Sequence, residues 1–216
     1  MNLSLEYKIR EPKVKLDKNP LLLLLHGYGS NEADLFSFAA ELPDEYYIIS
    51  ARAPYDMQYG SYAWYAINFD ADQNKFSDHD QAKVSRDLIA GFIDELIQTY
   101  PIDPEKVTLV GFSQGSILSY AVALSYPEKV QKVVAMSGYL NLEIVSDDYL
   151  KNTFNNLKIF ASHGTSDQVI PVAWARKTPA VLENLGIDIT YKEYPIGHGV
   201  APQNFYDFKS WLVDHK

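Results

Sequence analysis

Hydrophobic residues in this chain form short, strand-like runs separated by longer stretches with helical spacing. The five leucines at 21–25 form an unbroken apolar run, which is typical of a parallel strand covered on both faces. A second run at 107–110 is mostly β-branched, and the Ala- and Leu-rich stretch 116–126 after it stops at Pro127, as a helix does. Further short strands are predicted at 46–51, 132–136, 157–161 and 188–194.

The stretches between these strands favour helices. Segment 78–100 is predicted to be a long helix, because Val84, Leu88, Phe92 and Leu96 recur at four-residue intervals and Ser77 and Asp80 have capping-box spacing. Strands that alternate with helices indicate an α/β fold with a mainly parallel sheet, and we expect residues 1–216 to form a single domain. Further helices are predicted at 31–41, 172–185 and 202–214, and an edge strand at 4–9.

Composition narrows the classes of partner. The 216 residues are 47 % hydrophobic, carry a formal charge of −9 and contain no block of Lys or Arg, which argues against nucleic acid or an anionic membrane as the main partner. Cysteine is absent, so disulfides and thiolate metal sites are excluded. Residues 1–8 lack the pattern of a signal peptide, and the run at 21–25 is far shorter than the ~20 residues that span a bilayer. We therefore expect a cytoplasmic protein without membrane insertion.

Ser113 lies between the run at 107–110 and the following helix, in the sequence Gly111-Phe112-Ser113-Gln114-Gly115. Glycines two places before and after a serine permit a sharp strand-to-helix turn that lifts the hydroxyl above the end of the strand. The pattern G-x-S-x-G in this context predicts a nucleophile elbow. The backbone N–H of Gln114, at the positive end of the helix, is then a candidate to stabilise a negative charge that forms beside Ser113.

A serine nucleophile needs a base, and the base needs an acid that orients it. Asp167 and His198 both follow predicted strands that come after Ser113, so all three residues are expected at the carboxyl edge of the sheet. The chain order Ser, Asp, His is the order of an α/β-hydrolase. The other histidines fit less well, since His26 and His163 precede any available acid in this order, His79 begins a helix and His215 lies in the last turn.

A second oxyanion donor is expected in the loop after an early strand, and the backbone N–H of Tyr28 is our candidate. His26 and His163 are expected to hydrogen-bond to loop backbone. The aromatic segment 52–77 is predicted to be irregular, and Trp64 and Tyr65 could either line a substrate pocket or simply cover the sheet.

A metal site is not favoured. Residues 70–74 begin like a calcium-binding loop, but Lys75 stands where glycine is required and Gln81 where glutamate is required. We expect no metal and no cofactor.

With these residues in place, the chain resembles the carboxylesterase/phospholipase branch of the α/β-hydrolases, which includes acyl-protein thioesterases and small bacterial esterases. The similarity covers residues 21–212. It depends on Leu25-His26-Gly27-Tyr28-Gly29, on the motif around Ser113, on the stretch from His163 to Pro171, and on Gly197-His198. Ser116 departs from the family, which usually has Gly or Ala there.

The resemblance implies Ser113 as nucleophile, His198 as base, Asp167 as its orienting acid, and the amides of Tyr28 and Gln114 as oxyanion donors. It also implies a fold without a large lid. We expect hydrolysis of small-molecule carboxylic esters, or thioesters, through an acyl-enzyme. A peptidase on the same fold and a non-catalytic binding module are the alternatives, and the sequence leaves the acyl chain length and the oligomeric state open.

Overall fold

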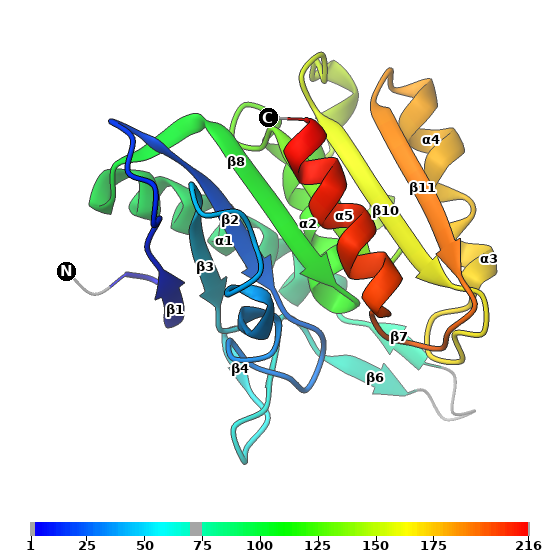
Figure 1. The fold of residues 1–216 in the computed structure, drawn as a ribbon. Helices are drawn as coiled ribbons and strands as arrows, with labels where there is room; N and C mark the ends of the chain where they lie inside the picture. The colour runs from blue at the N-terminus through cyan, green and yellow to red at the C-terminus, as the bar shows by residue number, and fades with distance from the viewer. Residues whose placement is uncertain (1–2, 70–74, 216) are drawn as a thin grey trace.

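A seven-stranded sheet forms the centre of the molecule in the computed structural model, which describes residues 3–69 and 75–215 (Figure 1). The strand order is β1-β3-β2-β8-β9-β10-β11, and only β1 runs antiparallel to its neighbour among the described strands of this sheet. The expected α/β fold with a mainly parallel sheet is therefore confirmed. The strands are β1 (Tyr7–Arg10), β2 (Asn19–Leu25), β3 (Tyr47–Ala51), β8 (Ile102–Phe112), β9 (Lys132–Met136), β10 (Lys158–Gly164) and β11 (Asp188–Tyr194).

The leucine run at 21–25 lies in β2, between β3 and β8, and all five side chains are fully buried. Alternate residues point to opposite faces of a strand. Leu21, Leu23 and Leu25 accordingly belong to one core cluster, and Leu22 and Leu24 to another on the opposite face. A strand buried on both sides needs apolar residues at every position, which explains the unbroken run.

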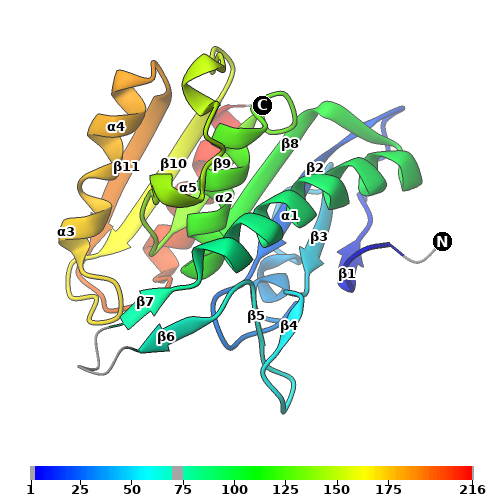
Figure 2. The same cartoon turned by 180° about the vertical axis from the view of Figure 1, so that it is seen from behind.

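Helices cover both faces of the sheet. Figure 2 shows α1 (His79–Thr99) and α2 (Gln114–Ser125) on one face, with α3 (Val172–Ala175) and α4 (Thr178–Asn184) beside β11. The other face carries α5 (Pro202–Asp214), which crosses in front of the strands in Figure 1, and the short 3₁₀ helix η1 (Leu35–Phe38). Two further 3₁₀ turns are η2 (Leu142–Ile144) and η3 (Tyr149–Lys151). No helix in the described ranges is long and apolar enough to cross a membrane.

The segment 52–77, predicted to be irregular, contains two short hairpins instead. One pairs β4 (Tyr55–Asp56) with β5 (Tyr62–Ala63), and the other pairs β6 (Ile67–Phe69) with β7 (Lys75–Ser77). The second hairpin lies beyond the carboxyl ends of the parallel strands (Figures 1 and 2). The stretch that begins like a calcium-binding loop, 70–74, lies outside the described residues.

The helix predicted at 31–41 is wrong, since the structure forms only η1 there. Asn31 Oδ1 accepts a hydrogen bond from Ala33 N at 2.9 Å, which offers the backbone a turn in place of a helix. The bonds that follow span three residues, as in Ser37 N to Asp34 O at 3.0 Å. Leu35 in this short helix still packs on the sheet.

The helix predicted at 172–185 is broken after Ala175 into α3 and α4. Pro179 lies in the first turn of α4, where a proline is tolerated because its missing N–H has no intrahelical acceptor there. A proline in the middle of one continuous helix would remove a hydrogen bond, so the chain begins a new helix instead.

Details of two other elements also differ from expectation. Asp78, and not Ser77, caps α1, since its side chain accepts from Gln81 N at 3.0 Å. Val84 is 58 % exposed, because four residues exceed one turn of 3.6 residues and a strict four-residue spacing drifts off the buried face. The edge strand runs over Tyr7–Arg10, a few residues later than predicted.

Candidate active site

Ser113 occupies the turn between β8 and α2. Its backbone has φ +52° and ψ −115°, a region that residues with a side chain rarely adopt. The flanking glycines are required sterically, because a Cβ on Gly111 would lie 2.4 Å from Gly115 O and a Cβ on Gly115 would lie 2.0 Å from Leu25 O. Close packing on both sides therefore holds the strained turn, and Ser113 lies in the wall of a cavity of about 700 Å³.

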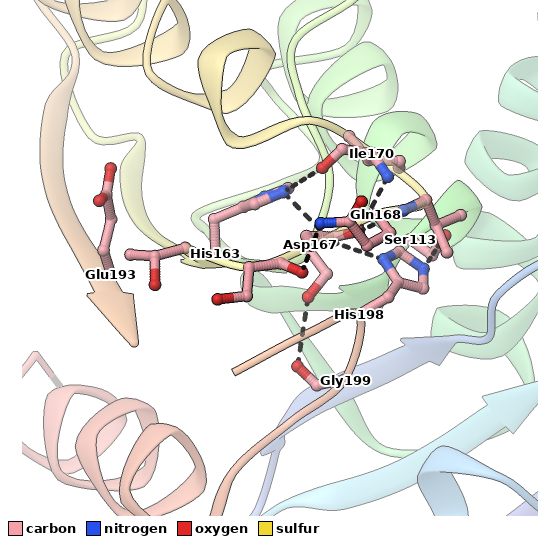
Figure 3. A network of polar contacts seen from close by, with 12 residues as sticks. Ser113, His163, Asp167, Gln168, Ile170, Glu193, His198 and Gly199 are labelled. Carbon is pink, nitrogen blue, oxygen red and sulfur yellow. Dashed lines mark hydrogen bonds and ion pairs between the residues drawn. The ribbon is translucent and has the colours of Figure 1, made fainter. Parts of the chain in front are cut away.

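The structure brings together the three residues that the sequence singled out (Figure 3). Ser113 Oγ lies 2.9 Å from His198 Nε2, and His198 Nδ1 lies 2.7 Å from Asp167 Oδ2. Asp167 follows β10 and His198 follows β11, and these strands are neighbours in the sheet. Both side chains consequently reach the carboxyl edge where Ser113 lies.

Backbone contacts hold the two loops that carry Asp167 and His198 against each other. Ser166 N donates to Ile196 O at 3.0 Å, and a Cβ on Gly164 would lie 2.3 Å from Gly197 O. Only a residue without a side chain allows this approach. The separation between the acid and the imidazole is therefore set by main chain.

Ser137 anchors the next residue of the histidine loop. It follows β9 with φ +54°, and its hydroxyl donates to Gly199 O at 3.2 Å. The phenyl ring of Phe112 lies 5.0 Å from the His198 ring, between centroids. Phe112 thus packs near the imidazole, while Ser137 holds the backbone that follows His198.

Asp167 is fully buried and ionised. Its Oδ1 accepts from Val169 N at 2.8 Å and from Ile170 N at 2.9 Å, while Oδ2 faces His198. Burial alone would raise the pKa of this carboxyl, but the hydrogen bonds from His198, Ile170 and Val169 outweigh burial and hold the pKa below its ordinary value.

These contacts define the proton positions. A carboxylate only accepts hydrogen bonds, so the hydrogen between Asp167 and His198 is on Nδ1. His198 Nε2 then directs its lone pair at the hydroxyl of Ser113. In this tautomer the imidazole can take the serine proton while the serine oxygen attacks a carbonyl carbon.

His26 and His163 both hydrogen-bond to loop backbone, as predicted. His26 Nδ1 lies 2.7 Å from Gly27 O, and His163 Nε2 lies 2.8 Å from Ile170 O. His163 also contacts Asp167, which the sequence did not predict.

The amides of Tyr28 and Gln114 remain our candidates for an oxyanion hole. Gln114 is the first residue of α2, where backbone N–H groups have no acceptor within the helix. The loop after β2 lies against this helix end, since a Cβ on Gly27 would be 3.4 Å from Ser113 Cβ. Tyr28 and Gln114 line the same cavity as Ser113.

The side chain of Gln114 makes two hydrogen bonds that the sequence did not predict. Its Oε1 accepts from Trp64 N at 2.8 Å, and its Nε2 donates to Tyr65 O at 2.8 Å. The buried amide therefore binds the backbone of the aromatic segment at two successive residues. We call this pair of hydrogen bonds the Gln114 clamp.

The structure places the two aromatic pocket candidates differently. Tyr65 lines the cavity, whereas Trp64 is fully buried and is not among the described residues that line it. The Trp64 indole donates to His26 O at 2.9 Å, and Ser85 Oγ donates to Trp64 O. Trp64 thus supports the loop from beneath, which agrees with the second of the two alternatives left open for this residue.

The described residues contain no cluster of three or more His, Cys, Asp or Glu side chains that could hold a metal ion. His79 forms an ion-pair contact with Glu143, 2.8 Å from Nδ1 to Oε2. This pair lines the cavity and is considered further below.

Comparisons with known proteins agree with the fold. A carboxylesterase from Bacillus cereus superposes with a TM-score of 0.86 at 20 % identity, covering 100 % of this chain and 96 % of that chain. The esterase PE8 superposes with a TM-score of 0.83 at 23 % identity, covering 99 % and 100 %.

Sequence comparison finds relatives that include proteins named acyl-protein thioesterase, probable carboxylesterase and lysophospholipase-like protein. Acyl-protein thioesterase 1 of Emericella nidulans is 28 % identical over 211 residues, 88 % of each chain. A protein of Oryza sativa subsp. japonica named "probable carboxylesterase" is 30 % identical over 115 residues, which span 53 % of this chain and only 43 % of the rice protein. The family model described as phospholipase/carboxylesterase matches residues 7–216, nearly the whole chain. The chain therefore belongs to the phospholipase/carboxylesterase family of α/β-hydrolases.

Proposed function

We propose that this protein hydrolyses carboxylic esters of small to medium acyl groups, and thioesters of the same acids, through an acyl-enzyme on Ser113. One observation carries the proposal: the unbroken line of hydrogen bonds from Ser113 Oγ through His198 to Asp167, at a cavity open to a ligand. The names of the relatives, carboxylesterase and acyl-protein thioesterase, support the same two substrate classes.

In the first half-reaction, Ser113 Oγ attacks the carbonyl carbon as His198 Nε2 takes the hydroxyl proton. The carbonyl oxygen becomes an oxyanion, which the amides of Tyr28 and Gln114 stabilise. His198 then gives the proton to the leaving oxygen or sulfur, the carbon–oxygen or carbon–sulfur bond breaks, and the acyl group remains on Ser113. Asp167 keeps the imidazole in the required tautomer and stabilises its positive charge.

In the second half-reaction, water replaces the alcohol or thiol. His198 takes a proton from the water, the hydroxide attacks the acyl carbon, and the proton returns to Ser113 Oγ as the acid leaves. An imidazole must be neutral to act as this base.

Replacing the nucleophile tests the proposal directly. We expect Ser113→Ala to lower kcat on p-nitrophenyl esters by on the order of 10⁴ to 10⁶, because members of such a triad act as a unit. Ser116→Ala is the matched control, since Ser116 is buried in the same helix and its Oγ has no hydrogen-bond partner among the described residues. Ester turnover above a tenth of the original in Ser113→Ala would end the proposal.

Two alternatives remain open to experiment. A peptidase would cleave a matched anilide as readily as the ester, so parallel assays on both substrates separate the two activities. A non-catalytic binding module would not react with a fluorophosphonate, whereas the proposed hydrolase should be labelled at Ser113 and not at Ser116.

A further inference from the structure

A polar bridge crosses one end of the cavity that contains Ser113. His79 Nδ1 lies 2.8 Å from Glu143 Oε2, and Asn141 Nδ2 lies 3.5 Å from His79 Nε2. His79 is the first residue of α1, while Asn141 and Glu143 belong to the start of η2. All three line the cavity, so the bridge connects two elements that contribute to its wall.

The bridge is fixed at both ends. Asn141 Oδ1 accepts from Glu143 N at 3.1 Å, which holds the Asn141 side chain against the backbone at the beginning of η2. Arg86 Nη1 donates to Ile144 O at 2.8 Å and so ties η2 to α1. A carboxylate only accepts hydrogen bonds, so His79 Nδ1 donates to Glu143, and the other ring nitrogen faces the amide of Asn141.

The side chains that line the cavity differ in their exposure to solvent. Tyr65 and Ile117, which line it, are 3 % and 5 % exposed, whereas the side chains of His79 and Glu143 are 36 % and 72 % exposed. Buried apolar side chains therefore form one part of the cavity wall, and the bridge belongs to a part that is exposed to solvent. The apolar lining residues in addition to Tyr65 and Ile117 include Ile67, Tyr139 and Leu140, which are partly buried, and the more exposed Trp174.

We propose that the His79–Glu143 bridge is a specificity determinant that limits the length of the alkyl chain this site accepts. The inference rests on the proposed ester hydrolysis. Each further methylene placed on an apolar wall improves binding about fourfold. A methylene that reaches the bridge meets polar groups already paired with one another, so it gains nothing or must break their hydrogen bonds. The site thereby selects esters of short and medium chain over those of long-chain fatty acids or alcohols.

Two series of substrates test this limit. One varies the acyl group from acetate to palmitate on a constant p-nitrophenyl leaving group, and the other varies the alcohol of an acetate ester. In the wild type, kcat/KM should rise with chain length and then fall in one of the series. In His79→Leu/Glu143→Met the fall should move to longer chains, raising the long-to-short ratio of kcat/KM by about tenfold or more in that same series.

Matched variants distinguish a specific effect of the bridge on chain-length preference from a general loss of stability. Glu143→Gln keeps a hydrogen-bond acceptor and should retain the wild-type length preference. Asp94→Leu/Lys129→Met removes another ion pair of α1, 2.6 Å long, neither of whose members lines the cavity, and it should leave the ratio unchanged. Glu143→Met alone alters an exposed side chain, so it provides the same test without risk to folding.

The inference is overturned if the long-to-short ratio in His79→Leu/Glu143→Met and in Glu143→Met equals that of the wild type in both series. It is also overturned if the Asp94→Leu/Lys129→Met control shifts the ratio equally. Failure of the proposed function is a different result, because it would leave Ser113→Ala active on every ester.

Discussion

His163 Nε2 lies 3.3 Å from Asp167 Oδ2, the same carboxylate oxygen that His198 Nδ1 approaches at 2.7 Å. Both His163 and Asp167 have fully buried side chains. His163 Nε2 also lies 2.8 Å from Ile170 O, while Ile170 N donates to Asp167 Oδ1 at 2.9 Å. His163 therefore closes a ring of contacts around the carboxylate that orients the proposed base (Figure 3).

We expect His163→Gln to lower kcat by on the order of tenfold to a hundredfold, with KM nearly unchanged. His163 does not line the cavity, so it acts only by holding Asp167, and a small rotation of the carboxylate misdirects His198. Separate determination of kcat and KM tests this expectation, together with the rate at which a fluorophosphonate labels Ser113.

Asn19→Ala controls for a simple loss of stability. Asn19 is buried at the amino end of β2, and its side-chain amide donates to Val14 O at 2.9 Å and to Glu45 O at 2.7 Å, away from the site. A kcat loss in Asn19→Ala as large as that in His163→Gln would show that any destabilised variant behaves alike, and would remove the positioning role.

The Gln114 clamp gives a second prediction. Gln114→Met preserves the approximate shape of the side chain and the backbone amide, but it leaves Trp64 N–H and Tyr65 C=O without their partner. Unpaired buried backbone groups cost about 1 to 3 kcal/mol each, so we expect the free energy of unfolding to fall by about 2 kcal/mol or more. Because Tyr65 lines the cavity, KM should rise as its loop loosens.

Urea denaturation and steady-state kinetics measure these two effects. Gln114→Glu is the informative companion variant, since it retains an acceptor for Trp64 N–H but turns a second oxygen toward Tyr65 O. It should therefore destabilise at least as much as Gln114→Met. A wild-type free energy of unfolding in both variants would show that the clamp contributes nothing.

The sequence was a good guide where a constraint is local. The glycines at 111 and 115 predicted a tight turn at Ser113, and the structure has backbone approaches there that exclude any side chain. The strands β9 and β11 and the helix α5 have the bounds that the pattern predicts. Asp167 and His198 were found by the same logic, because parallel strands place their carboxyl ends at one edge.

Contacts between segments that are distant in the sequence could not be predicted from local patterns. The Gln114 clamp joins residues about fifty positions apart, and the His79–Glu143 bridge joins residues 79 and 143. Neither leaves a periodic signal, since one buried amide or one surface ion pair looks the same in the sequence whatever it contacts. The two alternatives for Trp64 could not be separated for a related reason, because an aromatic ring can equally cover a sheet or line a cavity.

Replacing glycine by alanine should change the free energy of unfolding in opposite directions at positions 115 and 91. In Gly115→Ala the new Cβ would lie 2.0 Å from Leu25 O, a backbone atom that cannot move aside. We expect a loss of about 3 kcal/mol or more in the free energy of unfolding, with loss of activity. Gly91 lies within α1 with no neighbouring heavy atom inside 4 Å of a new Cβ, so Gly91→Ala should stabilise the protein by about 1 kcal/mol.

Thermal and urea denaturation of the two alanine variants compare them directly. Unchanged activity in Gly91→Ala is expected, because the residue is on the solvent side of α1. Equal stability of the two variants would contradict the close approach between α2 and β2 on which the Ser113 turn depends.

His26 is fully buried between two backbone groups that fit only its neutral form. Its Nδ1 carries the hydrogen that Gly27 O accepts at 2.7 Å, and its Nε2 accepts from Ala53 N–H at 3.1 Å. A second ring proton would point at the Ala53 N–H. Burial lowers the pKa of His26 below its ordinary value, so the folded protein keeps this imidazole uncharged in weak acid.

Folding stability should consequently depend on pH through this residue. As the pH falls through about 6.5, the unfolded chain binds a proton at His26 that the folded chain does not, so the free energy of unfolding decreases. His26→Gln removes the titrating group, and its free energy of unfolding should fall less steeply between about pH 7 and about pH 5 than that of the wild type. Urea titrations at several pH values provide both slopes, and the two proteins share every other titratable group, so their difference reports on His26. Parallel slopes would mean that the folded chain accepts the proton at His26 as easily as the unfolded chain, which the N–H of Ala53 should prevent.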